Sequence, residues 1–348
     1  MTAVPSLASH HVRRDLVATA SAFTLGLLLL CAFLAIAGFD VAVALTALWR
    51  GAFGSWYAIS SATLVRATPL IILGLAFTLA SRGGALNIGM EGQFALGATA
   101  ATWSALHATT LPPLVAIPMV LGVGAIAGAA WVLVPVALRL RFGVTEVIST
   151  LLLNFVADGV VSYAVTGPLQ EPTHIYPQSA TIAASAQLPR LIEGARMHLG
   201  LPIALLLAAL LGLLLQRSRW GFRLRAVGAG ATAARISGGI AAPAVLASAL
   251  LWSGALAGLG GAIEVSGVSR ALYQNLSPGY GFTAIAVALL GRLQPLGVVI
   301  AGLLFGALEA GAGAMQRDAG IPAVAVQVVE AVVILSLVVL TRRRATEQ

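Results

Sequence analysis

The densest group of chemically capable side chains lies in one short glycine-rich run, residues 82–93. Asn87 and Glu91 are four residues apart, so on a helix they share a face, and Gln93 follows closely. Amide groups donate and accept hydrogen bonds and a carboxylate accepts them, which suits sugar hydroxyls or the edge of a base. The glycines permit a tight turn and close backbone contact. The run favours solute binding, although a buried Glu and Asn could instead tie a turn together.

Other polar residues interrupt long apolar runs elsewhere. Ionisable groups in such runs are costly and usually face the interior of a helix bundle or an aqueous cavity. Glu146 follows two arginines at the start of a run, which is typical of a helix N-terminal charge. We predict Asn87, Glu91, Gln93 and Asn154 as residues of a solute pathway. Asp158, Glu264, Glu309 and Glu330 are further acidic candidates, and each of these could instead cap or bridge helices.

Catalytic and metal-binding signatures are absent from the sequence. The five histidines are scattered, and the one cysteine, Cys31, lies in an apolar run. The sequence contains no H-E-x-x-H, C-x-x-C or G-x-S-x-G pattern. All twenty basic residues are Arg, and the Walker A loop needs a Lys on the nucleotide phosphates. We therefore predict no catalytic residue, metal site or cofactor, and the chain cannot hydrolyse ATP by the P-loop route.

The elements that carry these residues are membrane helices. Of the 348 residues, 59% are hydrophobic and only 9% are charged, whereas soluble domains carry roughly 25% charged residues. The 38 glycines also favour membrane helices, because Gly is more frequent in membrane helices than in soluble ones. Glycine pairs at i, i+4, such as Gly124 and Gly128, further predict closely packed helices. The fold class that follows is all-α, a polytopic bundle forming a single transmembrane domain over residues 1–348.

The apolar runs predict about ten spans of roughly 20 residues each. The segment 16–37 is too long for a signal peptide and is predicted to be an uncleaved first helix. The segments 82–93 and 278–282 are too rich in Gly, Pro and polar residues for ordinary helices, so we predict a re-entrant or broken stretch. The predicted spans are 16–37, 57–80, 87–107, 113–138, 145–165, 199–215, 241–263, 281–293, 296–316 and 322–341.

The arginines predict the orientation, because cytoplasmic loops carry an excess of basic residues. With both termini inside, most of the twenty arginines fall on the inner side. This assigns 1–15 and 342–348 to the cytoplasm, 167–198 to an external loop, and 216–240 to an inner segment. The arginines lie between apolar runs, so a nucleic acid partner is not expected.

Four segments together resemble one transporter family. They are Arg82 to Gln93, Gly143 to Asn154, Trp220 to Ile240 and Gly279 to Gly291. These segments resemble the permeases of ABC importers for nucleosides and simple sugars, which are related to ribose and branched-chain amino acid permeases. The nucleoside-type branch is the most similar. The resemblance runs from about Thr63 to the last span.

The resemblance implies a permease subunit of an ATP-binding cassette importer in a bacterial inner membrane. It implies alternating access driven by separate cytoplasmic ATPase subunits, a second permease subunit that is usually a different chain, and an extracytoplasmic solute-binding lipoprotein. The stretch 221–240 is similar to the family's ATPase-coupling segment, on which Gly221, Arg223, Arg225, Gly228 and Arg235 fall. Relatives often read Gly-x-Asn-Pro after Arg-Ala-Val, whereas this chain reads Gly228-Ala-Gly-Ala231, which leaves the turn before Ala233 open.

An ion-coupled secondary transporter is the alternative function. Both transporter classes can contain broken helices near the middle of the membrane. In that alternative, Glu91, Glu264 or Glu309 would bind a proton or sodium ion. ATP-dependent uptake that needs the other subunits would favour the importer, and uptake by the lone chain driven by a proton gradient would favour the alternative.

Overall fold

The computed structural model describes residue 24, residues 28–322, and residues 328 and 331. These residues form an all-α protein in which extended pairing is limited to isolated bridges. Residues 28–36 are also helical. The labelled helices are α2 (Val41–Phe53), α3 (Trp56–Ala58), the π-helix η1 (Ile59–Thr63), α4 (Leu64–Arg82), α5 (Met90–Leu106), α6 (Pro113–Phe142), α7 (Glu146–Thr166), the 3-10 turn η2 (Ala184–Ala186), α8 (Gly200–Arg217), α9 (Arg219–Ala229), α10 (Ala231–Gly238), α11 (Ala242–Glu264), the π-helix η3 (Val265–Ser269), α12 (Tyr280–Leu290) and α13 (Pro295–Ala319).

The prediction of a polytopic helix bundle is confirmed. Within the described residues, six helices are long and apolar enough to cross a membrane: Trp56–Arg82, Pro113–Phe142, Glu146–Thr166, Gly200–Arg217, Ala242–Ser269 and Pro295–Ala319. Two shorter apolar helices accompany them, α2 and α12. Half of the first predicted span, 16–37, and most of the tenth, 322–341, lie outside the described residues.

Helix α2 was not predicted from the sequence. Asp40 caps it, because its carboxylate accepts hydrogen bonds from the backbone N–H groups of Ala42 (2.8 Å) and Val43 (3.0 Å). At 13 residues, α2 is shorter than a membrane span.

The described residues divide into two compact units. The larger unit is Ser60–Gly306, and the smaller one combines the residues up to Ile59 with those from Ala307 onward. In the smaller unit, α2 packs against the last turns of α13. A side chain added to Gly51 would overlap Ala314, and one added to Gly311 would lie within 3 Å of Leu48.

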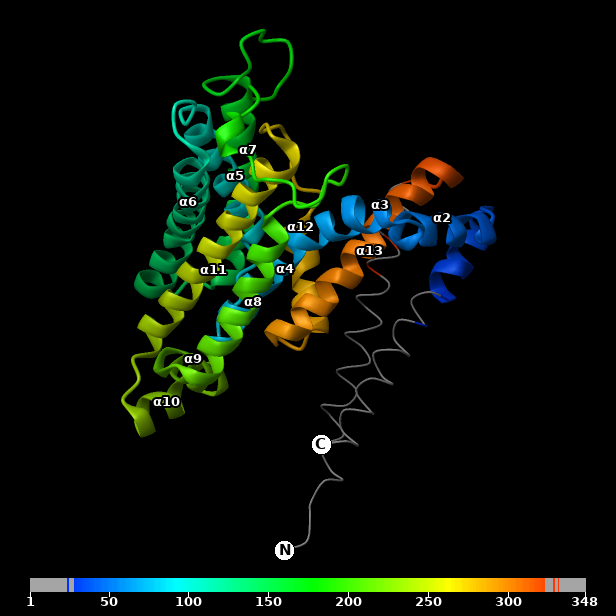
Figure 1. Ribbon diagram of the computed structural model, residues 1–348. Coiled ribbons are helices and arrows are strands. Elements are labelled where there is room, and N and C mark those ends of the chain that lie inside the picture. The colour runs from blue at the N-terminus through cyan, green and yellow to red at the C-terminus, as the bar shows by residue number, and fades with distance from the viewer. Residues whose placement is uncertain (1–23, 25–27, 323–327, 329–330, 332–348) are drawn as a thin grey trace, which may run out of the picture. The chain divides into compact units, whose positions relative to one another are not determined.

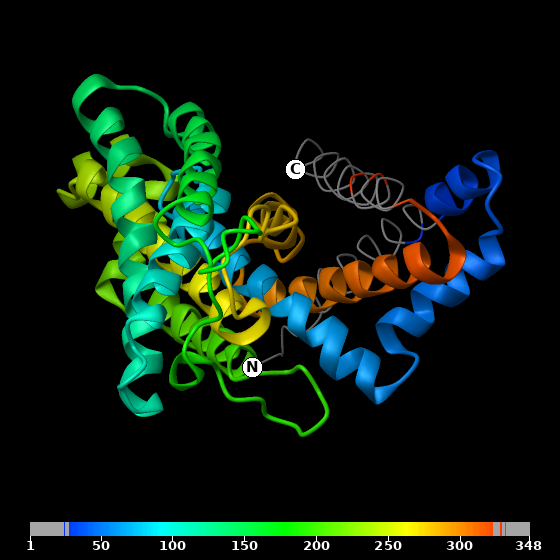
Figure 2. The same ribbon diagram turned by 90° about the horizontal axis from the view of Figure 1, so that it is seen from above.

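Helix α4 forms the centre of the larger unit. Every residue from Ala67 to Ala80 is buried. A helix that is apolar on all sides is buried on all sides, and α4 is covered by α8, α11 and α12. Figures 1 and 2 show α4 within this unit, with α5, α6 and α7 grouped beyond α11.

Helices α5, α6 and α11 approach one another at glycines. A side chain added to Gly258 would overlap the carbonyl oxygen of Gly124, and one on Gly97 would overlap the backbone of Gly258. A side chain on Gly128 would likewise overlap the carbonyl of Gly254. The i, i+4 glycines therefore make close backbone packing possible, as predicted.

The larger unit has two distinct ends. Helices α9 and α10 lie together at one end, and the loop after α7 lies at the other (Figure 1). This loop is bonded to the segment after α11: the N–H groups of Ser179, Ile182 and Leu188 donate to the carbonyls of Leu272 (2.7 Å), Arg270 (2.9 Å) and Ser266 (2.9 Å). These bonds satisfy backbone groups in a segment that has almost no regular structure of its own.

Candidate functional site

Two helices of the larger unit are interrupted, as the sequence predicted. Helix α4 ends at Arg82, residues 83–89 are not α-helical, and α5 begins at Met90. Gly84 has a φ of +79°, a left-handed conformation that glycine adopts without strain. The second interruption separates η3 from α12, and Gly279, with a φ of +101°, precedes Tyr280.

The N-termini of α5 and α12 meet at Glu91. The Gly281 N–H donates to a Glu91 carboxylate oxygen at 2.6 Å, and the Ser277 side chain also bonds this carboxylate. A side chain on Gly281 would lie 2.8 Å from the Glu91 α-carbon, so only glycine allows this approach. The rings of Phe94 and Tyr280 contact each other edge-on, with centroids 6.1 Å apart. Both helix N-termini present positive partial charge, which stabilises an anion between them.

Asn87 holds the break between α4 and α5 in place. Its amide nitrogen donates to Gln93 Oε1 (2.8 Å) and to Ser253 Oγ in α11 (2.9 Å). Its amide oxygen accepts from Gln93 Nε2 (3.0 Å) and from the Gly89 N–H (3.1 Å). Asn87 is completely buried, so these bonds replace those that water would have made.

Helix α7 supplies the remaining contacts to the break. Asn154 Oδ1 accepts from the Gly92 N–H (2.9 Å), and Asn154 Nδ2 donates to the Ile88 carbonyl (3.0 Å). Thr150 Oγ1 accepts from the Ile88 N–H at 3.3 Å. One orphan N–H group of α5, that of Gly92, thus finds its partner on α7, which fixes the start of this helix.

The structure brings the four predicted pathway residues together but gives them different environments. Asn87, Gln93 and Asn154 are buried and bonded to protein groups, whereas Glu91 is only partly buried. The sequence did not predict Thr150, Ser253, Ser277 and Gly281 as partners. Ser253 and Gly281 meet the break only through long-range packing, so local spacing gave no signal for them.

The predicted coupling residues lie on α9 and α10. Ser218 caps α9 by accepting from the Gly221 N–H at 2.9 Å. Arg223 and Arg235 are exposed, and Arg225 is half-buried. The turn that the sequence left open is a break of one residue: α9 ends at Ala229 and α10 begins at Ala231.

Helix α9 contacts the break directly. A side chain on Gly228 would overlap the carbonyl oxygen of Arg82, and the Gly228 α-carbon would lie 3.4 Å from a Cβ added to Gly84. Arg82 is in turn fixed by its Nε, which donates to the Leu293 carbonyl at 3.0 Å in the loop after α12. The last residue of α4 therefore connects α9 to the break before α5 and to the loop after α12.

Other charged groups have structural contacts. Glu146, in the first turn of α7, forms an ion pair with Arg139 (3.4 Å), consistent with its predicted role at a helix start. Glu264 is buried at the end of α11, within electrostatic reach of Arg66 and Arg196. Among the described residues, no three His, Cys, Asp or Glu side chains are grouped as a metal would require.

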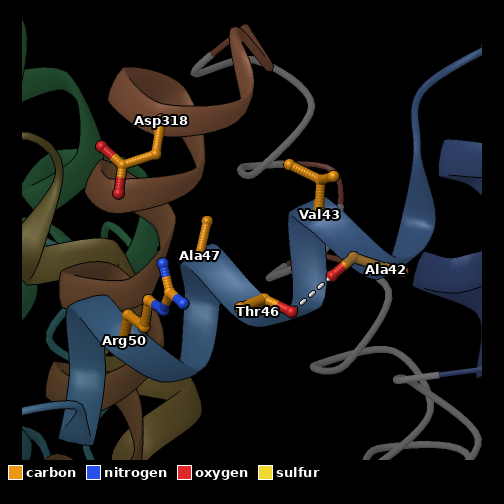
Figure 3. Close-up of a pocket in the computed structure, with 6 residues that line it drawn as sticks. All are labelled: Ala42, Val43, Thr46, Ala47, Arg50 and Asp318. Carbon is orange, nitrogen blue, oxygen red and sulfur yellow. Dashed lines mark hydrogen bonds between the residues drawn. The ribbon is translucent and has the colours of Figure 1, made fainter.

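The described residues also line two open grooves. One, of about 340 Å³, lies between α2 and the end of α13, and Figure 3 shows Arg50 and Asp318 facing this opening. Its other lining residues are Ala42, Val43, Thr46 and Ala47. The second, of about 710 Å³, lies among α5, α6 and α7 and is mostly apolar, with Trp103, His107 and Trp131 on its walls. Neither groove gathers polar groups comparable to those around Glu91.

Comparison with known proteins places the chain in a family. The model of the family "Branched-chain amino acid transport system / permease component" matches residues 59–340. The guanosine ABC transporter permease protein NupP of Bacillus subtilis is 38% identical, with 90% of each chain covered. The glucose ABC transporter permease protein TsgB13 of Haloferax volcanii is 39% identical over 79% of this chain and 74% of its own. The nucleoside ABC transporter permease protein NupB of Lactococcus lactis is 33% identical over 93% and 90%, respectively.

No solved structure matches the chain significantly. The family match covers both interrupted helices and the α9–α10 end, and the relatives align over nearly the whole of this chain. The chain therefore belongs to this permease family and is a multi-pass membrane permease subunit of an ABC importer.

Proposed function

We propose that this permease carries a nucleoside or a simple sugar across the membrane by alternating access. The relatives are named for guanosine, nucleosides and glucose, all of which are small, neutral and rich in hydroxyl groups. Carboxylate and amide groups at membrane depth suit such solutes, because they replace the hydrogen bonds that the solute makes with water. Selectivity then comes mostly from the external binding protein, and the pathway binds the solute weakly.

The observation that carries the pathway proposal is the bond from Gly281 to Glu91. Two short helices that begin inside the bundle converge on one carboxylate, an arrangement that transporters use at solute sites. In this proposal Glu91 faces the solute. Asn87, Gln93 and Asn154 form the wall behind it and hold the start of α5 in position.

The energy for transport comes from ATPase subunits, which the family implies together with a solute-binding protein. We propose that ATP is hydrolysed only on these subunits and that this chain transforms no substrate covalently. The second permease subunit is a different chain, and the solute-binding partner is an extracytoplasmic lipoprotein. Residues 1–348 act as a single permease domain in a bacterial inner membrane.

The α9–α10 end is the cytoplasmic end in this proposal, with both chain termini on the same side and the 167–198 loop outside. Gly221, Arg223, Arg225, Gly228 and Arg235 then belong to the surface that docks on an ATPase. The contact of Gly228 with the Arg82 carbonyl transmits ATPase movement to the break.

Uptake into membrane vesicles tests this function. Vesicles containing the permease, its ATPase and its second permease subunit, supplied with the solute-binding protein, are expected to accumulate labelled guanosine or glucose only with ATP. Glu91→Leu should abolish accumulation, and Glu91→Gln should retain part of it because the amide still accepts a hydrogen bond from Gly281. ATP-independent uptake by the chain alone, driven by a proton gradient, would overturn the proposal in favour of a secondary transporter.

A further inference from the structure

Helix α7 carries a polar residue at every fourth position along its length. The residues are Thr150, Asn154, Asp158, Ser162 and Thr166. Residues spaced by four lie above one another on a helix, so these side chains form one continuous stripe, which we call the α7 polar stripe. A polar stripe on a membrane-spanning helix must face protein or water, because lipid offers no hydrogen-bond partners.

Three members of the α7 polar stripe have partners in other segments. Thr150 and Asn154 bond the break before α5, as described above. Ser162 Oγ accepts a hydrogen bond from Gln274 Nε2 at 2.6 Å, in the interruption before α12. The α7 polar stripe therefore extends from the break before α5 to the interruption before α12.

Asp158 lies between these bonded members and has a different environment. It is exposed, and within the described part of the chain no hydrogen bond or ion pair to it is present. It lies twelve residues from the start of α7 and eight from its end, roughly 18 Å and 12 Å along the axis. Its carboxylate is close enough to Glu91 for the two to interact electrostatically.

An exposed carboxylate in the middle of a span cannot face lipid without a large cost in free energy. The same helix shows what a lipid-compatible surface looks like: Val156, two residues away and nearly opposite on the helix, is 51% exposed and apolar. Most other exposed residues of α7 are apolar, and Asp158 lies at the border of this apolar surface. The Asp158 carboxylate therefore needs water, a polar ligand or a polar group of another protein chain as its partner.

We propose that Asp158 lines the solute pathway and accepts hydrogen bonds from solute hydroxyl groups, opposite Glu91. This inference rests on the proposed function and adds to it a residue on a second helix. Phe155, one turn before Asp158 on the same helix, is 69% exposed. A carboxylate beside an aromatic ring suits a ribose hydroxyl with its base, or a hexose with its apolar face against the ring.

Cysteine accessibility tests the position of Asp158. In a Cys31→Ala background, which removes the native thiol, Asp158→Cys and Val156→Cys are compared in vesicles that hold the whole transporter. A charged, water-soluble methanethiosulfonate is the probe. We expect Asp158→Cys to react about tenfold faster or more, because a thiol in lipid stays protonated and only the thiolate reacts. Saturating guanosine or glucose should slow the reaction at position 158 alone.

Two results would overturn the inference. Equal, slow labelling at both positions would place Asp158 against lipid or beneath the second permease subunit. Fast labelling that no solute slows would show that position 158 is exposed to water but lies outside the solute pathway. ATP-driven uptake by the Cys31→Ala protein, measured in the same vesicles, tests the proposed function separately. The inference about Asp158 and the proposed function can therefore fail independently.

Discussion

Gly228 in α9 lies directly against the carbonyl oxygen of Arg82, the last residue of α4. A single added methyl group at position 228 would overlap this oxygen. Because Arg82 immediately precedes the non-helical break, displacement of α9 changes the position of the break. In the proposed importer this contact links the ATPase-docking surface to the break that precedes Glu91.

Gly228→Ala should impair transport without preventing ATPase binding. The methyl group must push α9 away from Arg82, and overpacking of this kind costs about 1–3 kcal/mol. Uptake into vesicles should fall several-fold, while co-purification of the ATPase stays normal. Gly122→Ala in α6 is the matched control, because nothing lies within 4 Å of a Cβ there. Normal uptake by the Gly228→Ala protein would show that this contact does not transmit movement of α9 to the break.

Arg225→Glu should weaken docking of the ATPase. Arg225 is half-buried on α9, and reversing its charge should disturb a docking contact made by the arginine while leaving membrane insertion intact. Co-purification of the ATPase is the measurement. Arg190→Glu, an exposed arginine in the loop at the opposite end, is the control and should leave co-purification unchanged. Equal co-purification of the ATPase with the Arg225→Glu and native chains would argue against docking through α9.

Asn87→Leu should strongly destabilise the bundle. The change leaves Gln93, Ser253 and the Gly89 N–H without their shared partner, and each buried unpaired group costs about 1–3 kcal/mol. Ser253→Ala removes one acceptor only and should cost less. Thermal unfolding in detergent gives the comparison, and a Ser253→Ala protein as unstable as Asn87→Leu would contradict the central role of Asn87.

His198 should make stability depend on pH. It lies in the loop after α7, outside the spans, with 2% of its surface exposed, and burial followed by the charge of Arg196 lowers its pKa to about 4. The unfolded chain, with a His pKa of about 6.5, binds a proton at this position between about pH 6.5 and pH 4, whereas the folded chain does not. Stability is therefore complete above pH 6.5 and falls as the pH drops towards 4, by about 2 kcal/mol at pH 5.

His198→Asn separates this effect from packing. The Asn side-chain oxygen can replace Nδ1, which accepts from the Gly200 N–H at 3.1 Å, but it does not titrate. The melting temperature of the native protein should fall between about pH 7 and pH 5 more steeply than that of the variant. Parallel curves for the two proteins would assign the pH dependence to other groups.

The bundle and the break were predictable because both depend on local sequence. Apolar runs of spanning length define helices by composition, and residues 82–93 contain too many glycines and polar groups to continue one. Asn87, Gln93 and Asn154 were predicted as pathway residues from polarity at membrane depth, and hydrogen bonds at the break bring them close to one another. Whether they contact a solute remains a proposal.

What could not be predicted depends on long-range packing. The bond from Gly281 to Glu91 joins residues 190 positions apart, and nothing in either local sequence specifies the partner. Helix α2 was missed because it is too short to span, so its apolar residues gave no signal of the expected length. The spacing of the α7 polar stripe is visible in the sequence, but the partners of Thr150, Asn154 and Ser162, and the exposure of Asp158, depend on the packing of α7.

The glycine contacts among α5, α6 and α11 have a mechanical consequence. Backbone lies against backbone at Gly97, Gly124 and Gly258, so sliding or rotating any one of these helices would drive main-chain atoms into each other. The three helices must shift as one rigid block during a transport cycle. Relative motion in a transport cycle is then expected between this block and the helices around it, and not within the block.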